Sequence, residues 1–209
     1  TARSILFGPQ DPKNYIYPDK AGFWQTGFPG GSHEYLVDNG NGGRDMDGRT
    51  LFFYLATVNT PAMALEIPGV GSQYAFTSRD GTGAYLDGSN TYKLNSPANP
   101  PAQKFWSFVV YDPQTRSMLQ SGEMPYPSKN NKRNADMVKN ADGSIDLYFG
   151  PAAPAGMEAN WVKTVPGKGW FGIFRLYGPG QAWFDRTWKL GDIEKLSLIH
   201  ISEPTRPLR

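Results

Sequence analysis

Short apolar segments separated by turn residues dominate the pattern of this chain. From Phe105 to Tyr111 every residue except Ser107 is aromatic or β-branched, so both alternating faces of that segment are apolar. The residues that follow, DPQT at 112–115, are typical of a type I turn, with aspartate and proline at its first two positions. The pattern predicts a β-hairpin over residues 104–120 whose first strand is covered on both faces.

Similar strand patterns recur through most of the chain. The expected strands are 72–78, 84–87, 91–95, 137–139, 145–149, 159–164 and 169–177. Only the segment 44–60 predicts a helix, which Asp45 or Asp47 would cap and whose apolar face would include Leu51 and Leu55. Residues 1–43 are rich in Gly, Pro and Asn and predict loops with isolated short strands. Together these elements favour an all-β sandwich or barrel.

Composition and charge narrow the classes of function. At 209 residues with 39% hydrophobic content, the chain can bury a sizeable core. The net charge of +2 comes from interspersed acids and bases, which is not the pattern of a nucleic-acid-binding surface. The absence of cysteine excludes thiol nucleophiles, thiolate metal sites and disulfides. No apolar run reaches transmembrane length, and because the chain begins at Thr1 without a methionine or a signal peptide, we interpret it as a fragment.

Several longer motifs resemble one bacterial family. They are PGVGSQY from Pro68, YLDG from Tyr85, FWSFVVYDPQTRSML from Phe105, NADGSIDLYFGP from Asn140, EANWVKTVPGKGWF from Glu158 and RLYGP from Arg175. The chain resembles domain of unknown function 1214, the C-terminal partner of domain of unknown function 1254, over about residues 59–194. It departs from the family at Leu190, where proline is commoner.

The resemblance implies an architecture and no activity. It implies a jelly-roll-like antiparallel β-sandwich at 67–195, a helical connector at 44–66, and a remnant of a preceding domain or linker at 1–43. It also implies a missing immunoglobulin-like N-terminal domain as a partner within the same chain, and export to the periplasm or beyond. Residues 196–209 resemble a translated sequencing adapter, so we expect them to be a non-native, disordered tail that packs against nothing.

Metal and triad chemistry lack the residues they need. Metal-binding jelly rolls use clustered histidines, whereas His33 is the only histidine outside the adapter-like tail. A serine triad would also depend on His33, which lies in a predicted loop. We therefore expect no metal and no cofactor.

Arg175 is the most informative single residue. It shares a face with Ile173 and Tyr177 in a strand that is otherwise apolar, and a buried guanidinium group needs a partner. We predict a structural ion pair with Asp146 or Asp112. In the alternative, Arg175 holds an anion or a sugar hydroxyl.

Two classes of function follow from these residues. The first is a binding module for a carbohydrate-like or anionic small ligand, or a structural module, which would be compatible with homo-oligomerisation. The candidate ligand-binding residues are Arg79, Tyr85, Asp112, Arg116, Asp146, Arg175 and Tyr177. The second is a metal-independent hydrolase that uses Arg175 with carboxylates from Asp87, Asp112, Asp142 and Asp146. An open pocket that contains Arg175 and two carboxylates would favour the enzyme, and an aromatic face would favour binding.

Overall fold

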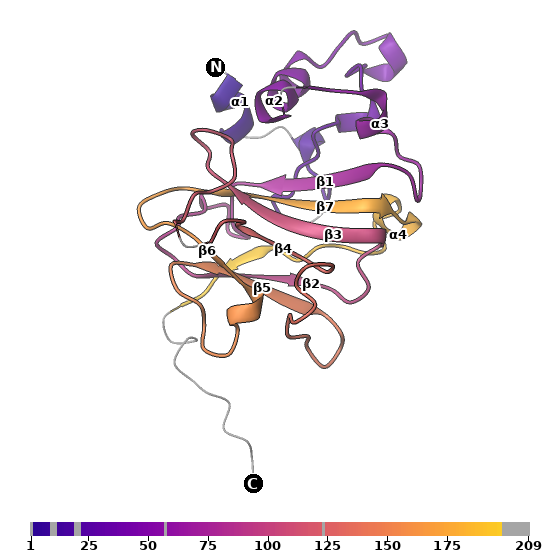
Figure 1. Ribbon diagram of the computed structural model, residues 1–209. Coiled ribbons are helices and arrows are strands. Elements are labelled where there is room, and N and C mark those ends of the chain that lie inside the picture. The colour runs from indigo at the N-terminus through magenta and orange to yellow at the C-terminus, as the bar shows by residue number, and fades with distance from the viewer. Residues whose placement is uncertain (1, 9–11, 19–21, 57, 123, 198–209) are drawn as a thin grey trace.

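Two four-stranded sheets stack face to face in the computed structural model, which describes residues 2–8, 12–18, 22–56, 58–122 and 124–197 (Figure 1). The first sheet has the strand order β1 (Ser72–Thr77), β7 (Phe171–Pro179), β3 (Ala102–Tyr111) and β4 (Ser128–Asn130). The second has the order β6 (Trp161–Lys163), β5 (Ile145–Gly150), β2 (Tyr92–Ser96) and β8 (Ile193–Lys195). This confirms the predicted β-sandwich, and it confirms the long strands expected around residues 105–111 and 169–177.

Strand pairing is antiparallel except at one edge. β5 and β6 run parallel, with Tyr148 opposite Trp161. The connection between them, which includes the 3₁₀ helix Glu158–Asn160, returns the chain to the start of the next strand so that both point the same way. The finer jelly-roll assignment stays a prediction.

The main core lies between the sheets. In β7, Phe174 and Leu176 are fully buried, whereas Ile173, Arg175 and Tyr177 alternate with them on the opposite face and are only half-buried. The period-2 alternation of the strand therefore divides its residues between the core and the outer face of the first sheet.

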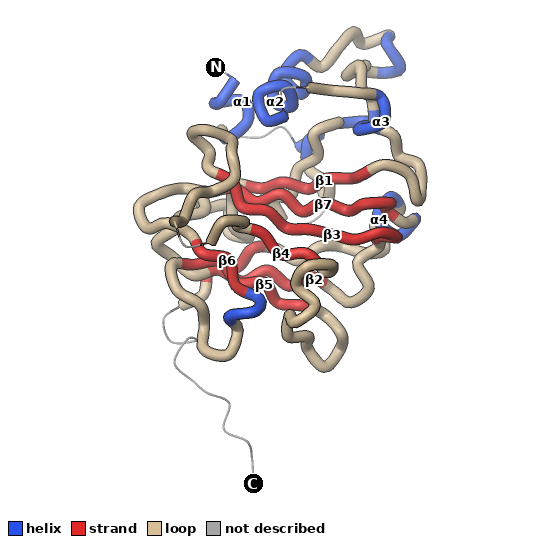
Figure 2. Tube along the Cα trace, in the orientation of Figure 1, coloured by secondary structure: helices blue, strands red, loops and turns tan. Residues whose placement is uncertain are grey.

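Helices cover part of that outer face. Figure 2 shows α1 (Ala2–Phe7), α2 (Met46–Ala56) and α3 (Pro61–Ala64) on the side of the first sheet that faces away from the second, while the short α4 (Gln181–Phe184) follows β7. Further 3₁₀ turns occupy Pro12–Asn14, Pro29–Gly31 and Asp38–Gly40. Leu6, Leu51 and Phe76 form a small apolar cluster that joins α1 and α2 to β1.

The predicted helix and its cap are present. α2 lies within the expected segment, and the Gly48 N–H donates to Asp45 Oδ1 at 2.9 Å. The short helix α1 was not predicted, because six residues are too few to show a helical period. The four residues of α3 lie within the helical connector expected at 44–66.

Part of the N-terminal segment belongs to the sandwich core. Ile16, Tyr17 and Trp24 are buried in the same cluster as the inward residues of both sheets. The Trp24 indole N–H donates to the Gly191 carbonyl at 2.8 Å, and the Leu190 N–H donates to the Tyr17 hydroxyl at 3.1 Å. Residues 1–43 were expected to lie apart as a loop-rich remnant, but these three side chains share the core of residues 67–195.

Other expected elements differ from the structure. The return strand at 116–120 is reduced to one bridge between Tyr111 and Met118, because Arg116 adopts a left-handed φ of 61° and β4 pairs with β3 instead. Residues 84–87 form only isolated bridges, and 137–139 form no strand. The Leu196 N–H donates to the Thr91 carbonyl at 2.8 Å, so the prediction that nothing after Lys195 makes contact is wrong at that residue. The rest of that prediction, at 198–209, lies outside the described residues.

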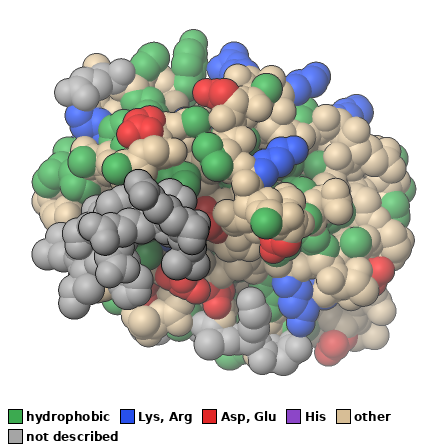
Figure 3. All heavy atoms as spheres, turned by 90° about the horizontal axis from the view of Figure 1, so that it is seen from below, with side chains coloured by type: hydrophobic (Ala, Val, Ile, Leu, Met, Phe, Trp, Pro, Cys, Tyr) green, Lys and Arg blue, Asp and Glu red, His purple; other side chains and the backbone are tan. Residues whose placement is uncertain are grey.

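The surface carries charges of both signs. On the face shown in Figure 3, basic and acidic side chains both occur among apolar and polar ones. Within the described ranges, no helix combines the length and the apolar character that a membrane span requires.

Candidate ligand pocket

An aromatic surface lies on the outer face of the first sheet. Residues directly opposite one another on adjacent strands point to the same side of a sheet. Arg175 lies opposite Tyr74 on β1 and Ser107 on β3, and Tyr177 lies opposite Ser72 and Phe105. At the other end of β7, Phe171 lies opposite Tyr111.

Arg175 is held by rings rather than by a carboxylate. Its guanidinium carbon lies 4.1 Å from the ring centroid of Tyr177 and 4.8 Å from that of Tyr74. One terminal nitrogen donates to Ser72 Oγ at 3.3 Å, and the buried Nε has no hydrogen-bond partner. Within the described part of the chain, no carboxylate forms an ion pair with Arg175.

The predicted ion pair of Arg175 is therefore wrong. Asp112 instead pairs with Lys168, whose Nζ lies 3.0 Å from Oδ2. Asp146 Oδ1 accepts a hydrogen bond from Asn95 Nδ2 at 2.7 Å across β2 and β5 in the second sheet. The strand of Arg175 is apolar on both faces, but its outer face is open enough for the long arginine stem to lie against tyrosine rings.

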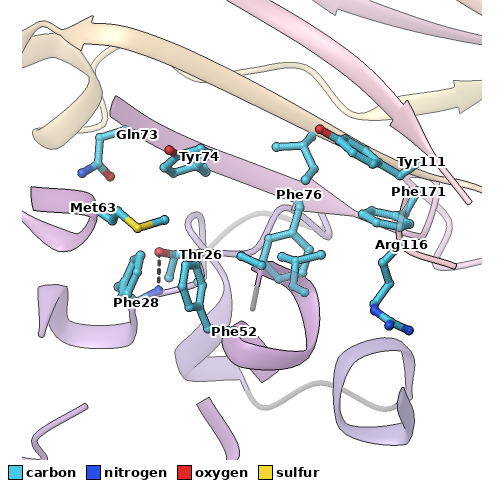
Figure 4. Close-up of a pocket in the computed structure, with 14 residues that line it drawn as sticks. Thr26, Phe28, Phe52, Met63, Gln73, Tyr74, Phe76, Tyr111, Arg116 and Phe171 are labelled. Atoms are coloured by element: carbon cyan, nitrogen blue, oxygen red, sulfur yellow. Dashed lines mark hydrogen bonds between the residues drawn. The ribbon is translucent and has the colours of Figure 1, made fainter. Parts of the chain in front are cut away.

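A cavity of about 260 Å³ separates the helical layer from this face of the sheet (Figure 4). Its floor comes from β1, β3 and β7, and its opposite wall comes from α2, α3 and residues 26–28. The lining residues are Thr26, Gly27, Phe28, Phe52, Leu55, Ala56, Met63, Gln73, Tyr74, Phe76, Tyr111, Arg116, Phe171 and Ile173. We call this cavity the helix–sheet pocket.

Packing holds the wall of the helix–sheet pocket in place. The rings of Phe28 and Phe52 lie 4.3 Å apart between centroids, and both are buried. The Phe28 N–H donates to Thr26 Oγ1 at 3.1 Å, which fixes the turn that presents Phe28. Figure 4 shows Phe28, Phe52 and Met63 on the side of the pocket opposite Tyr74.

Polar groups are few and mainly donate hydrogen bonds. Arg116 reaches the pocket from the loop after β3, and its guanidinium carbon lies 4.2 Å from the ring centroid of Tyr54. Burial raises the pKa of the Tyr111 hydroxyl, and the positive charge of Arg175 opposes that rise only in part. Tyr111 is thus a neutral phenol at neutral pH. Among the described residues, no carboxylate lines the pocket.

Arg79 and Tyr85 lie away from the helix–sheet pocket and anchor the N-terminal helix. The Arg79 guanidinium group lies 4.2 Å from the Tyr85 ring centroid and donates to the Gly8 carbonyl at 3.3 Å. The Tyr85 hydroxyl donates to the Phe7 carbonyl. The last carbonyls of a helix have no partners within the helix, so these hydrogen bonds cap the C-terminal end of α1.

Asp112 organises the turn after β3. Burial alone would raise the pKa of its carboxyl group, but the Gln114 N–H and the Lys168 ammonium group outweigh burial and hold the pKa below its usual range. Together with the position of Asp146 in the second sheet, this places the two predicted carboxylates outside the helix–sheet pocket. Of the seven residues predicted from the sequence, Arg116 lines that pocket, and Arg175 and Tyr177 lie on the same sheet face.

These observations define a two-sheet β-sandwich with an apolar pocket of small-molecule size on the outer face of one sheet. The chain belongs to the family described as Protein of unknown function (DUF1214), whose model matches residues 71–181. The family resemblance of the sequence is thereby confirmed, and the partner domain of unknown function 1254 stays a prediction.

A solved structure supports the fold. The VPA0106 protein from Vibrio parahaemolyticus is similar with a TM-score of 0.55 and 22% identity, over 79% of this chain and 39% of that chain. An uncharacterized protein from Burkholderia cenocepacia matches with a TM-score of 0.39 and 18% identity, over 66% of this chain and 32% of that chain. This chain thus spans well under half the length of either protein. A comparison with curated proteins finds no match.

Replacing Arg175 with methionine is expected to change the free energy of unfolding by less than about 1 kcal/mol, because half-buried cation–π contacts are weak and no buried carboxylate is left unpaired. The midpoint of thermal unfolding should move by no more than about 2–4 °C. The same variant should raise the pKa of Tyr111 further, since a nearby positive charge is removed. A loss of roughly 3–5 kcal/mol would instead show an ion pair.

Proposed function

We propose that this domain binds a small organic anion with an aromatic or similarly apolar body in the helix–sheet pocket. The observation that carries the proposal is the combination of an apolar cavity with cationic side chains that no described carboxylate neutralises. Arg116 lines the cavity, and Arg175 lies beside two of its lining residues, Tyr74 and Tyr111.

The apolar body accounts for most of the binding energy in this proposal. Phe28, Phe52, Phe76 and Met63 present rings and a thioether to the ligand, and burial of apolar surface contributes roughly 25 cal/mol per Å². Aromatic faces also favour a flat ring in edge-to-face or offset packing. A cavity of about 260 Å³ accepts a single-ring molecule with a short side chain.

The cationic side chains account for orientation. Arginine presents a planar fork of donors that matches a carboxylate, and the fork keeps its charge at any physiological pH. The carboxylate of the ligand would therefore point toward Arg116 or Arg175, and the neutral hydroxyl of Tyr111 would be a further hydrogen-bond donor.

The hydrolase alternative has less support. Acid–base hydrolysis needs two carboxyl groups, one on either side of the scissile bond, but no carboxylate of the described ranges lines the helix–sheet pocket. Asp112 and Asp146 are occupied by Lys168 and Asn95. We also propose, from the family resemblance alone, that the protein is exported.

Thermal shift with phenylacetate and its neutral analogue phenylacetamide tests this function. Phenylacetate should raise the unfolding midpoint, because a ligand that binds only the native state stabilises it by mass action. Phenylacetamide should bind at least roughly tenfold more weakly, which corresponds to about 1.4 kcal/mol. Equal stabilisation by both compounds would contradict a role for the arginines.

Two pairs of variants locate the effect. Ala56→Phe places a ring in the pocket and should abolish the shift, whereas Val58→Phe adds the same ring at an exposed position outside the pocket lining and should leave the shift intact. Arg116→Met should weaken phenylacetate binding, whereas Arg133→Met removes an arginine that also stacks on a tyrosine but lies elsewhere. If Ala56→Phe binds phenylacetate like the parent, the ligand does not occupy this pocket.

A further inference from the structure

A second cavity, of about 420 Å³, opens between two loops at one end of the sandwich. The loop that joins β2 to β3 contributes Asn99 and Pro100. The loop that joins β4 to β5 contributes Asn131, Asn134, Ala135, Met137, Lys139 and Gly143. Trp106, Met137 and Ile145 are buried side chains of the core that reach its floor. We call this cavity the loop cavity, and it shares no residue with the helix–sheet pocket.

Two asparagines in the loop cavity have amide groups whose orientation is determined. The Trp106 N–H donates to Asn131 Oδ1 at 3.0 Å, and the Asn130 N–H donates to Asn134 Oδ1 at 3.0 Å. A backbone N–H can only donate, so the acceptor in each case is the side-chain oxygen and the NH₂ group is turned to the other side. Among the described residues, neither NH₂ group has an acceptor.

The other polar groups of the loop cavity add further donors. Lys139 is the only charged residue among the described lining residues, and it forms no ion pair or hydrogen bond with the described part of the chain. The Asn99 side chain likewise has no described partner, and its φ of 54° places it in the left-handed region that asparagine tolerates. Asp136 and Asp142 are near in sequence but do not line the cavity, and Asp142 Oδ1 accepts the Ser144 N–H at 2.9 Å.

From this arrangement we infer that the loop cavity is a binding site for a sugar acid. Two oriented amide NH₂ groups and one ammonium group match a ligand that is rich in acceptors, which hydroxyl and carboxylate oxygens supply. The buried ring of Trp106 and the thioether of Met137 offer an apolar floor for the C–H face of a sugar ring. The ammonium group of Lys139 selects the carboxylate.

Titration of the whole protein with glucuronate, monitored by NMR of isotopically labelled methionine methyl groups, tests this inference. Glucuronate should shift the methyl signal of Met137 in the loop cavity and leave that of Met63 in the helix–sheet pocket unchanged. Glucose, which keeps the hydroxyl groups and lacks the carboxylate, should bind at least roughly tenfold more weakly.

Matched variants separate the donors from the fold. Asn131→Asp and Asn134→Asp each keep an oxygen that accepts the backbone N–H, but they replace the free NH₂ group by a negative oxygen, so each should weaken glucuronate binding at least tenfold. Asn41→Asp adds the same charge at an exposed turn that does not line the loop cavity, so this variant should bind glucuronate like the parent. Lys139→Met, which disturbs no described contact, should weaken binding of glucuronate and leave glucose unchanged.

Three results would overturn the sugar-acid site. The first is a Met137 signal that does not shift in about 50 mM glucuronate, a concentration that would nearly saturate a site of millimolar affinity. The second is an equal affinity for glucuronate and glucose. The third is that the Asn134→Asp and Lys139→Met proteins fold and bind glucuronate like the parent. Because this site and the helix–sheet pocket report through different methionines, the failure of one does not count against the other.

Discussion

Replacing Trp24 with alanine is expected to lower the free energy of unfolding by about 3–5 kcal/mol, the usual cost of removing a buried tryptophan. The indole ring is 1% exposed, packs edge-to-face against Phe108 at 6.3 Å between centroids, and donates to the Gly191 carbonyl. Chemical denaturation followed by circular dichroism and by tryptophan fluorescence measures the loss. The two signals should report one transition, because the N-terminal segment and the sandwich share a core.

A control for this variant is Phe53→Ala on the outer side of α2. Phe53 is 39% exposed, so its removal should cost less than about 1 kcal/mol. If Trp24→Ala were as mild as Phe53→Ala, or if fluorescence changed well before circular dichroism, residues 1–43 would form a unit separate from the sandwich.

Replacing Asn160 with alanine is expected to cost about 3 kcal/mol or more, since three backbone groups lose the partner that this buried side chain supplies. Asn160 is 1% exposed, and its Oδ1 accepts the Val138 N–H at 2.7 Å. Its Nδ2 donates to the carbonyls of Val138 and Asp146, each at 2.8 Å. This single amide therefore ties the β4–β5 loop to β5. Urea denaturation of the variant and the parent measures the difference.

Asn140→Ala provides the comparison for Asn160. Asn140 is exposed, and its side chain makes one hydrogen bond, to Ser144 Oγ at 2.9 Å. Its replacement should cost less than about 1 kcal/mol. Similar losses from the two variants would show that the buried amide network does not hold the loop.

The strands could be predicted from the sequence where local chemistry determines them. β3 and β7 are rich in aromatic and β-branched residues. The aspartate and proline after β3 form the expected turn, in which Asp112 Oδ1 accepts the Gln114 N–H at 2.7 Å. The return strand after this turn could not be predicted, because pairing with residues 128–130 or 116–120 depends on contacts across the sheet that no local pattern encodes.

Most residues of the helix–sheet pocket could not be predicted from the sequence. Arg116 was a predicted ligand-binding residue. Phe28, Phe52 and Met63 lie in segments whose sequences are typical of ordinary loops or helices, so no local pattern marks them as pocket residues. Tyr74 could have been found, since strand alternation places it with Phe76 on one face of β1, opposite Arg175 once the register is known. Asp112 and Asp146 were grouped with Arg175 because of their charge alone. The fold separates them, since register and sheet membership are long-range properties.

The measurement that tests the pocket most directly is a titration with phenylacetate, monitored by NMR of the labelled methyl groups of the six methionines. Met63 lines the helix–sheet pocket, and Met137 lies in the loop cavity. We predict that phenylacetate shifts the Met63 signal in a saturable manner, leaves the Met137 signal in place, and loses its effect in Ala56→Phe. A Met63 signal that stays fixed while phenylacetate stabilises the protein would contradict the proposed site.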